Sequence, residues 1–138
     1  MTMIKFNIPI APVPASRPRV TRTGHAYDTK QYSKFKRDVK YWLSFNYKDE
    51  LIEHKPIMID YTFYRNIQSS ISKKEHDRRK NNEVLPIVKP DLDNYVKAMQ
   101  DCLTGFVIGD DNMVVDSHAR KRYSEEPHIE VEITELGD

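Results

Sequence analysis

The sequence of 138 residues contains only one cysteine and no long apolar run. A single thiol cannot form a disulfide within the chain or supply a zinc site built from cysteines. None of the five histidines has metal-ligand spacing to another, so we assign none of them to a metal. No apolar stretch approaches the roughly 20 residues that cross a bilayer, and the N-terminus lacks the regions of a signal peptide. We therefore expect a cytoplasmic protein with no membrane partner.

Apolar residues are also scarce. They make up 38% of the chain, and the mean hydropathy is -0.72. This length and composition predict one domain, residues 1–138, with a modest core. The lone Cys102 lies beside an apolar stripe, which predicts a buried core thiol.

The net charge of +1 conceals an uneven charge distribution. Residues 1–27 carry four bases and no acid, residues 72–82 carry five bases and two acids, and the chain after Tyr123 carries six acids and no base. A folded molecule could therefore present one positive face, although charged runs are often only solvated loops. The candidate DNA-binding residues are Arg17, Arg19, Arg22, Lys73, Lys74, Arg78, Arg79 and Lys80.

Periodicity predicts an α+β fold. Apolar residues alternate from Ile4 to Ile10 and from Ile57 to Phe63, which indicates strands. Between them, the spacing from Tyr32 to Trp42 predicts a helix that Asp28 or Thr29 can cap and that runs to about residue 47. The segments 11–27 and 66–83 show neither period. We expect the first to be a long loop and the second a mobile one.

The second half of the chain predicts a short helix followed by strands. Apolar residues from Leu92 to Phe106 recur at helical spacing, and Gly105 can end that helix. Strand-like runs cover 113–123 and 128–135. We therefore expect a mixed β-sheet with two main helices packed against it.

The segment KPDLDNYVKAMQD, residues 89–101, crowds acidic side chains. If Asp91 is extended and Asp93 caps the helix, both carboxylates lie on one side, with Cα atoms about 6 to 7 Å apart. Lys97 returns to the same face one turn later. Asp110 and Asp111 lie in a turn from which they could swing toward the first pair. Oxygen ligands without convergent His or Cys favour Mg²⁺ or Mn²⁺, and such sites suit phosphodiester hydrolysis.

A purely structural interpretation of the same residues stays open. Asp93 is a good N-cap, Asp93 and Lys97 have the spacing of a helix ion pair, and Gly-Asp-Asp-Asn is an ordinary turn. Spacing alone does not decide between the two interpretations.

Several motifs together resemble a known family. "KPDLDN", Lys97, "GDDNMVVD" and the closing "IEVEITELG" are similar to the RusA family of Holliday junction resolvases, small homodimeric Mg²⁺-dependent endonucleases often carried by prophages. The early "SRPRVTR" resembles the Arg-Pro-Arg segment of phage-borne members. The resemblance is strongest over residues 89–136.

The resemblance implies roles for individual residues. Asp91, Asp93 and Asp111 match the essential carboxylates and Lys97 the catalytic lysine, while Asp110 matches the less certain first member of the acidic pair. The resemblance also implies a RusA-like fold, a homodimer and a branched DNA substrate. It implies Mg²⁺, or alternatively Mn²⁺, as the metal and no small-molecule cofactor.

We therefore predict an endodeoxyribonuclease that resolves four-way DNA junctions by paired symmetric nicks, leaving 5′-phosphate ends. Two alternatives remain. One is an aspartyl-phosphate phosphatase of the D-x-D type, although Pro86 and Pro90 interrupt the strand that its nucleophile would follow. The other is a DNA-binding accessory protein whose acidic cluster is merely structural.

Overall fold

The computed structural model describes residues 3–137 and has an α+β architecture built on a mixed four-stranded sheet. The sheet order is β1-β6-β4-β5, in which β4 pairs in parallel with β5 and the other pairs are antiparallel. The predicted fold class is confirmed. The four strands are β1 (Met3–Ile8), β4 (Ile57–Asn66), β5 (Val114–Ser124) and β6 (His128–Glu135).

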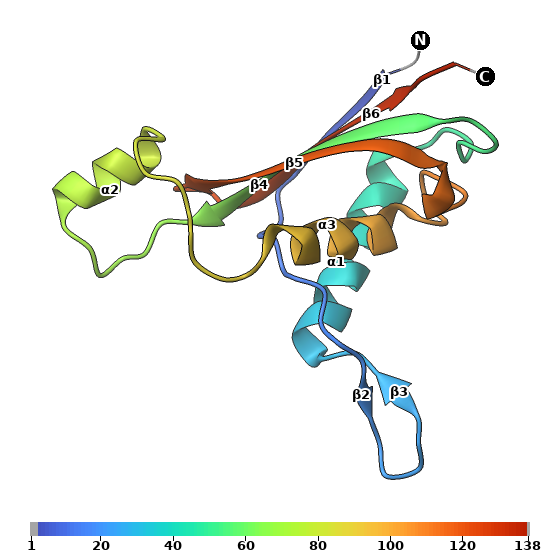
Figure 1. Ribbon diagram of the computed structural model, residues 1–138, viewed down its shortest axis with the longest axis horizontal. Helices are drawn as coiled ribbons and strands as arrows, with labels where there is room; N and C mark the ends of the chain where they lie inside the picture. Colours follow the sequence, from blue (N-terminus) through green and yellow to red (C-terminus); the bar gives the residue numbers. More distant parts are fainter. Residues whose placement is uncertain (1–2, 138) are drawn as a thin grey trace.

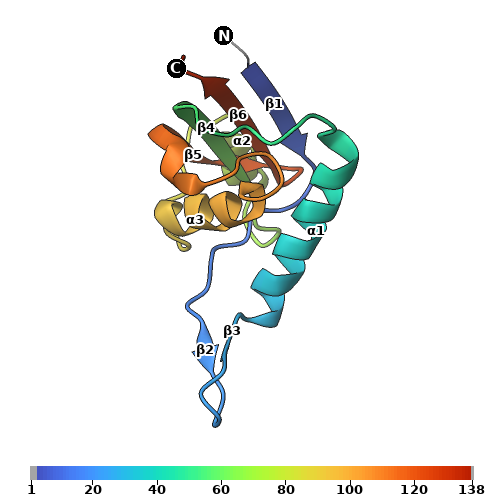
Figure 2. The same ribbon diagram turned by 90° about the vertical axis from the view of Figure 1, so that its right-hand side faces the viewer.

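Two helices cover one face of this sheet, as predicted (Figures 1 and 2). The alternating side chains of β4 and β6, such as Ile59, Phe63 and Val131, are buried on that face. On the opposite face, Arg120 donates to both carboxylate oxygens of Asp60 (2.6 and 3.1 Å), and this contact lowers the pKa of Asp60. The sheet therefore has one apolar side and one polar side, which explains the period of two in its sequence.

The first covering helix is α1 (Lys30–Asn46). Thr29 is its N-cap, and its side chain accepts a hydrogen bond from the N–H of Tyr32. The apolar stripe buries Val39 and Leu43, whereas Trp42 is only half-buried and meets Phe6 edge to face at 5.9 Å. The predicted helix is confirmed, with Leu43 rather than Trp42 as its last buried side chain.

The second covering helix is α3 (Leu92–Leu103). Its N-cap is Asp91 and not Asp93, which lies in the first turn, so that expectation was wrong. The helix stops because Thr104 is extended and Gly105 has a φ of +89°, a backbone conformation that favours glycine. Cys102 is buried against the core, as predicted.

Residues 66–83 are not the structureless loop that the sequence predicted, because they contain α2 (Lys73–Lys80). No residue of α2 is buried, so it leaves no apolar period in the sequence. Local contacts stabilise it instead: Ser72 caps the helix by accepting from the N–H of Glu75, and Glu75 pairs with Arg78 and Arg79.

Residues 11–27 contain a short hairpin within the predicted loop. Its strands are β2 (Arg19–Val20) and β3 (Ala26–Tyr27), joined by a turn in which Gly24 has a φ of +86°. Figure 1 shows this hairpin projecting away from the sheet beyond the start of α1. The two-residue strands are too short to show an alternation of apolar and polar residues in the sequence. Among the described residues, no helix is long and apolar enough to span a membrane.

Candidate active site

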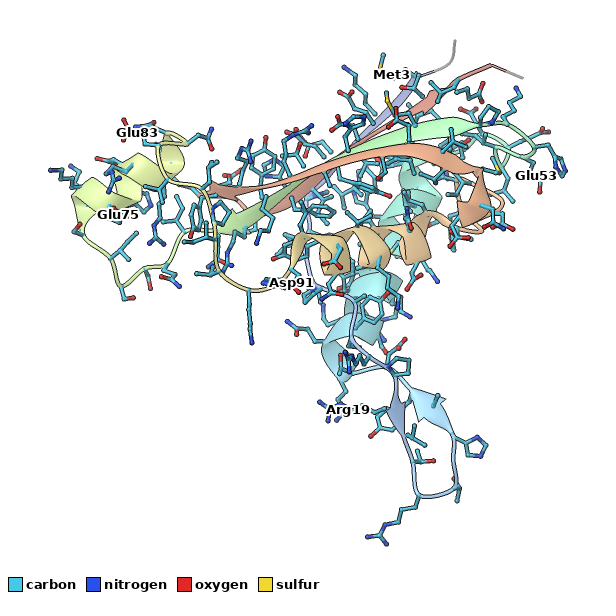
Figure 3. All side chains as sticks on the ribbon, in the orientation of Figure 1. Met3, Arg19, Glu53, Glu75, Glu83 and Asp91 are labelled. Carbon is cyan, nitrogen blue, oxygen red and sulfur yellow. The ribbon has the colours of Figure 1, made fainter. Side chains whose placement is uncertain are left out.

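The N-terminal end of α3 presents two carboxylates and an ammonium to solvent. Asp91, Asp93 and Lys97 are all exposed, and the carboxylate of Asp91 makes no capping hydrogen bond to the helix. Asp91 is extended (φ −66°, ψ 144°), as the sequence predicts. In Figure 3, Asp91 lies where the chain enters α3, beside the end of the sheet that carries α2. The carboxylate oxygens are therefore open to an external cation.

The structure does not favour the purely structural interpretation of this pair. Across residues 3–137, no ion pair within 4.0 Å involves Asp93 or Lys97. The ammonium of Lys97 is therefore not committed to Asp93 as a helix-surface partner.

Asp110 and Asp111 lie in the turn before β5. Asp110 caps the 3₁₀ helix η1 (Asp111–Met113), and its Oδ1 accepts from the N–H of Asn112 at 2.9 Å. This hydrogen bond lowers the pKa of Asp110. Asp111 is exposed. Asp110 therefore has a local structural role that Asp111 does not share.

The two acidic groups lie at opposite ends of α3. A helix of 12 residues is about 18 Å long, and the segment 111–113 lies beyond its C-terminal end (Figures 1 and 3). Within the described part of the chain, no group of three His, Cys, Asp or Glu side chains is placed to hold one metal ion. The expectation that Asp110 and Asp111 reach the first pair within one subunit was therefore wrong.

Two cations that sequence reasoning missed hold the backbone just before Asp91. Lys121 donates to the carbonyls of Val88 and Pro90, both at 3.1 Å, and Arg65 donates to the carbonyl of Lys89 at 2.7 Å. Lys121 lies on β5 and Arg65 near the end of β4. We call Lys121 and Arg65 the backbone clamp. They attach the entrance of α3 to the edge of the sheet.

The predicted DNA-binding residues lie in two separate places. Arg17, Arg19 and Arg22 are exposed on or beside the projecting hairpin. The cations of α2 are partly committed, since Arg79 stacks on Tyr123 at 4.9 Å and Lys80 pairs with Glu125 at 3.4 Å. Lys73 and Lys74 are exposed in the first turn of α2. The positive charges of the hairpin segment are therefore more available to DNA than those of α2.

The fold and these side chains define a class of protein, a small α+β protein with solvent-facing carboxylates and a projecting basic hairpin. The family model described as "Endodeoxyribonuclease RusA" matches residues 9–134. The chain therefore belongs to the RusA family and is an endodeoxyribonuclease. The protein "Uncharacterized protein YqaN" of Bacillus subtilis (strain 168) is 38% identical over 142 residues, covering 99% of both chains.

The structure disfavours the D-x-D phosphatase alternative. That class places its nucleophilic aspartate directly after a strand, whereas residues 81–90 contain no strand. The D-x-D segment here begins a helix instead.

Proposed function

We propose that this endodeoxyribonuclease is a homodimeric, Mg²⁺-dependent resolvase that cuts four-way DNA junctions by paired nicks. The observation that carries the proposal is the cluster of Asp91, Asp93 and Lys97 at the start of α3, in a chain of the RusA family. A nicking assay on a synthetic four-way junction, with and without Mg²⁺, tests it. Cleavage that continues in EDTA contradicts the metal requirement, and no cleavage with any divalent metal favours an accessory role.

The residues at the start of α3 fit a hard divalent cation. Asp91 and Asp93 supply carboxylate oxygens that are exposed and lie near no histidine or cysteine ligand set among the described residues. Mn²⁺ satisfies the same donor set, and we propose Mg²⁺ as the first metal to test. When bound, such an ion activates water and neutralises charge on the leaving oxygen.

The separation of the acidic groups supports a site shared between two subunits. Mg²⁺ binds oxygen at about 2.1 Å, so one ion cannot contact carboxylates at both ends of a helix about 18 Å long in one subunit. A two-fold axis across α3 would set the start of one helix beside the end of the other. Asp91 and Asp93 of one subunit would then meet the partner's Asp111. We infer that this dimer carries two such shared sites, one for each strand that is cut.

Lys97 acts on the phosphate in this proposal. Its side chain lies one turn after Asp93 and has no ion pair within the described residues to compete for it. It can therefore stabilise the negative charge that grows on the phosphate oxygens in the transition state. Nothing in this arrangement reads a base, which suits an enzyme that recognises junction shape.

The hairpin arginines should supply phosphate contacts. We expect Arg17, Arg19 and Arg22 changed together to glutamine to weaken junction binding, because all three are exposed on the projecting segment. The slope of log K against log salt should flatten by about 0.9 for each phosphate that the variant no longer neutralises. The measurement is junction affinity over a series of salt concentrations, without divalent metal. An unchanged slope would show that the hairpin does not touch the DNA.

The backbone clamp should set the metal affinity. Lys121→Met removes the ammonium that holds Val88 and Pro90 but keeps an unbranched side chain. Because Asp91 follows Pro90 directly, we expect the Mg²⁺ concentration for half-maximal cleavage to rise by about tenfold or more. Excess Mg²⁺ should restore the rate. The matched control is Arg122→Met, whose side chain bonds only to the adjacent Lys121 carbonyl among the described residues. A slower rate that excess Mg²⁺ does not correct would contradict this role.

A further inference from the structure

The outer face of α1 carries a groove that the proposed active site does not use. It has a volume of about 580 Å³ and lies between the middle of α1 and Phe106, in the turn after α3. This volume is within the range of sites that bind ligands of nucleotide size. Its charged lining consists of Lys36, Arg37 and Lys40, and none of its lining residues is acidic. We call it the α1 groove.

The charge of the α1 groove favours an anion. Helix α1 contains five Lys or Arg residues and one acid, Asp38, whose carboxylate is held by Lys34 at 2.6 Å. Lys36 is paired with Asp28 at 2.5 Å, whereas Arg37 and Lys40 make no ion pair within 4.0 Å among the described residues. The groove therefore keeps two uncompensated cations. Such a surface attracts phosphates.

Two aromatic rings flank these cations. Tyr41 is 68% exposed and Phe106 is 40% exposed, and both line the groove. The ammonium of Lys40 lies 5.9 Å from the centre of the Phe106 ring. Burying such rings against another surface is favourable, and bases stack on aromatic side chains whatever their sequence. Exposed aromatic rings alternating with cations are the combination that binds single-stranded nucleic acid. A base-paired duplex offers the cations its phosphates but offers the rings nothing to stack on.

The α1 groove is connected along the chain to the basic hairpin and to the acidic turn. Residues 28 and 29 alone separate the basic hairpin from α1 (Figure 2). At the other end, Phe106 precedes Asp110 by four residues. This connection fits a strand that enters the groove from the side of the hairpin and leaves it toward the carboxylates that follow α3.

We propose that the α1 groove binds unpaired nucleotides of the DNA substrate, with phosphates on Arg37 and Lys40 and bases on Tyr41 and Phe106. This inference rests on the proposed function, since it assigns the groove to the strand that leads to the cleavage site. A strand opened at a branch point supplies such unpaired nucleotides, whereas an intact duplex does not.

The test compares the affinities of a labelled oligothymidine strand and a blunt duplex of equal length, by fluorescence anisotropy in EDTA. Tyr41→Ala should weaken the affinity for the single strand by about tenfold and change the affinity for the duplex by no more than about twofold. Tyr41→Phe should keep the affinity, because it keeps the ring. Arg37→Gln should weaken single-strand binding more than Lys34→Gln, which removes the same charge from the same helix outside the groove.

Three outcomes would overturn the proposal. The first is that Tyr41→Ala and Arg37→Gln bind the single strand with wild-type affinity. The second is that these variants lose affinity for the single strand and for the duplex equally. A change of oligomeric state in Tyr41→Ala, measured by light scattering, would assign the exposed ring to a contact between subunits. The assay needs neither metal nor cleavage. Failure of the groove therefore leaves junction nicking by the wild type intact, and failure of nicking leaves single-strand binding intact.

Discussion

Asp91→Asn and Asp111→Asn should each lower the single-turnover rate of junction cleavage by about 10³-fold or more, which corresponds to about 4 kcal/mol in activation free energy. Each change removes one charge from the proposed metal site and preserves the shape of the side chain. Both residues are exposed, so the free energy of unfolding should change by less than about 0.5 kcal/mol. Junction binding without metal should persist, because the hairpin cations are untouched.

The control for this pair is Asp49→Asn, an exposed carboxylate outside the proposed metal site whose replacement removes the same charge. Its cleavage rate should equal that of the wild type. If Asp91→Asn or Asp111→Asn cleaves at the wild-type rate, the residue that was changed is not a ligand of the metal. If the cleavage rate of Asp49→Asn falls as much as those of the site variants, the loss of a negative charge alone explains their lower rates.

Lys97→Ala should lower the single-turnover rate by about 10²-fold, equivalent to about 2.7 kcal/mol, with junction affinity nearly unchanged. The ammonium offsets charge that grows only in the transition state, so its removal affects the chemical step and not binding. Lys97→Arg should rescue poorly, because a planar guanidinium does not replace a compact ammonium beside a metal. The measurement is single-turnover cleavage at saturating Mg²⁺.

The matched control is Lys5→Ala, which removes an exposed lysine from β1, where its partner is Glu132. The account of Lys97 would be contradicted by equal cleavage rates in the wild type, Lys97→Ala, Lys97→Arg and Lys5→Ala. Lys97 would then be a helix-surface residue without a role in catalysis. Its removal should in any case cost little stability, because a helix-surface charge contributes about 0.5 kcal/mol or less.

The sequence predicts the elements whose burial has a regular period. The alternating strand from Ile57 to Phe63 and the stripe beginning at Tyr32 could be identified directly, because one face of each is buried against the core. Helix α2 could not be found in this way, since capping and ion pairs stabilise it without burial. Its local signals were the spacing of Ser72 and Glu75 and that of Glu75 with Arg78 and Arg79, which apolar periodicity does not detect.

The candidate site was predicted in its parts and not in its arrangement. The sequence places Asp91, Asp93 and Lys97 at the start of one helix because local spacing fixes their relation. It cannot place Asp111, whose distance from them depends on how the chain turns after α3. The backbone clamp was missed for the same reason, since Lys121 lies 31 residues from Pro90 along the chain. A lysine in a strand is ordinarily interpreted as a surface residue.

Mixing two inactive variants tests the shared site most directly. If each site combines Asp91 of one subunit with the partner's Asp111, a dimer of one Asp91→Asn subunit and one Asp111→Asn subunit keeps one intact site. Mixing the two variants under conditions of subunit exchange should therefore restore nicking of one strand per junction, while each variant alone stays inactive. If both residues serve a site within one subunit, every site in the mixed dimer lacks a carboxylate. No recovery of nicking, in a mixture shown to contain the mixed dimer, would contradict the account.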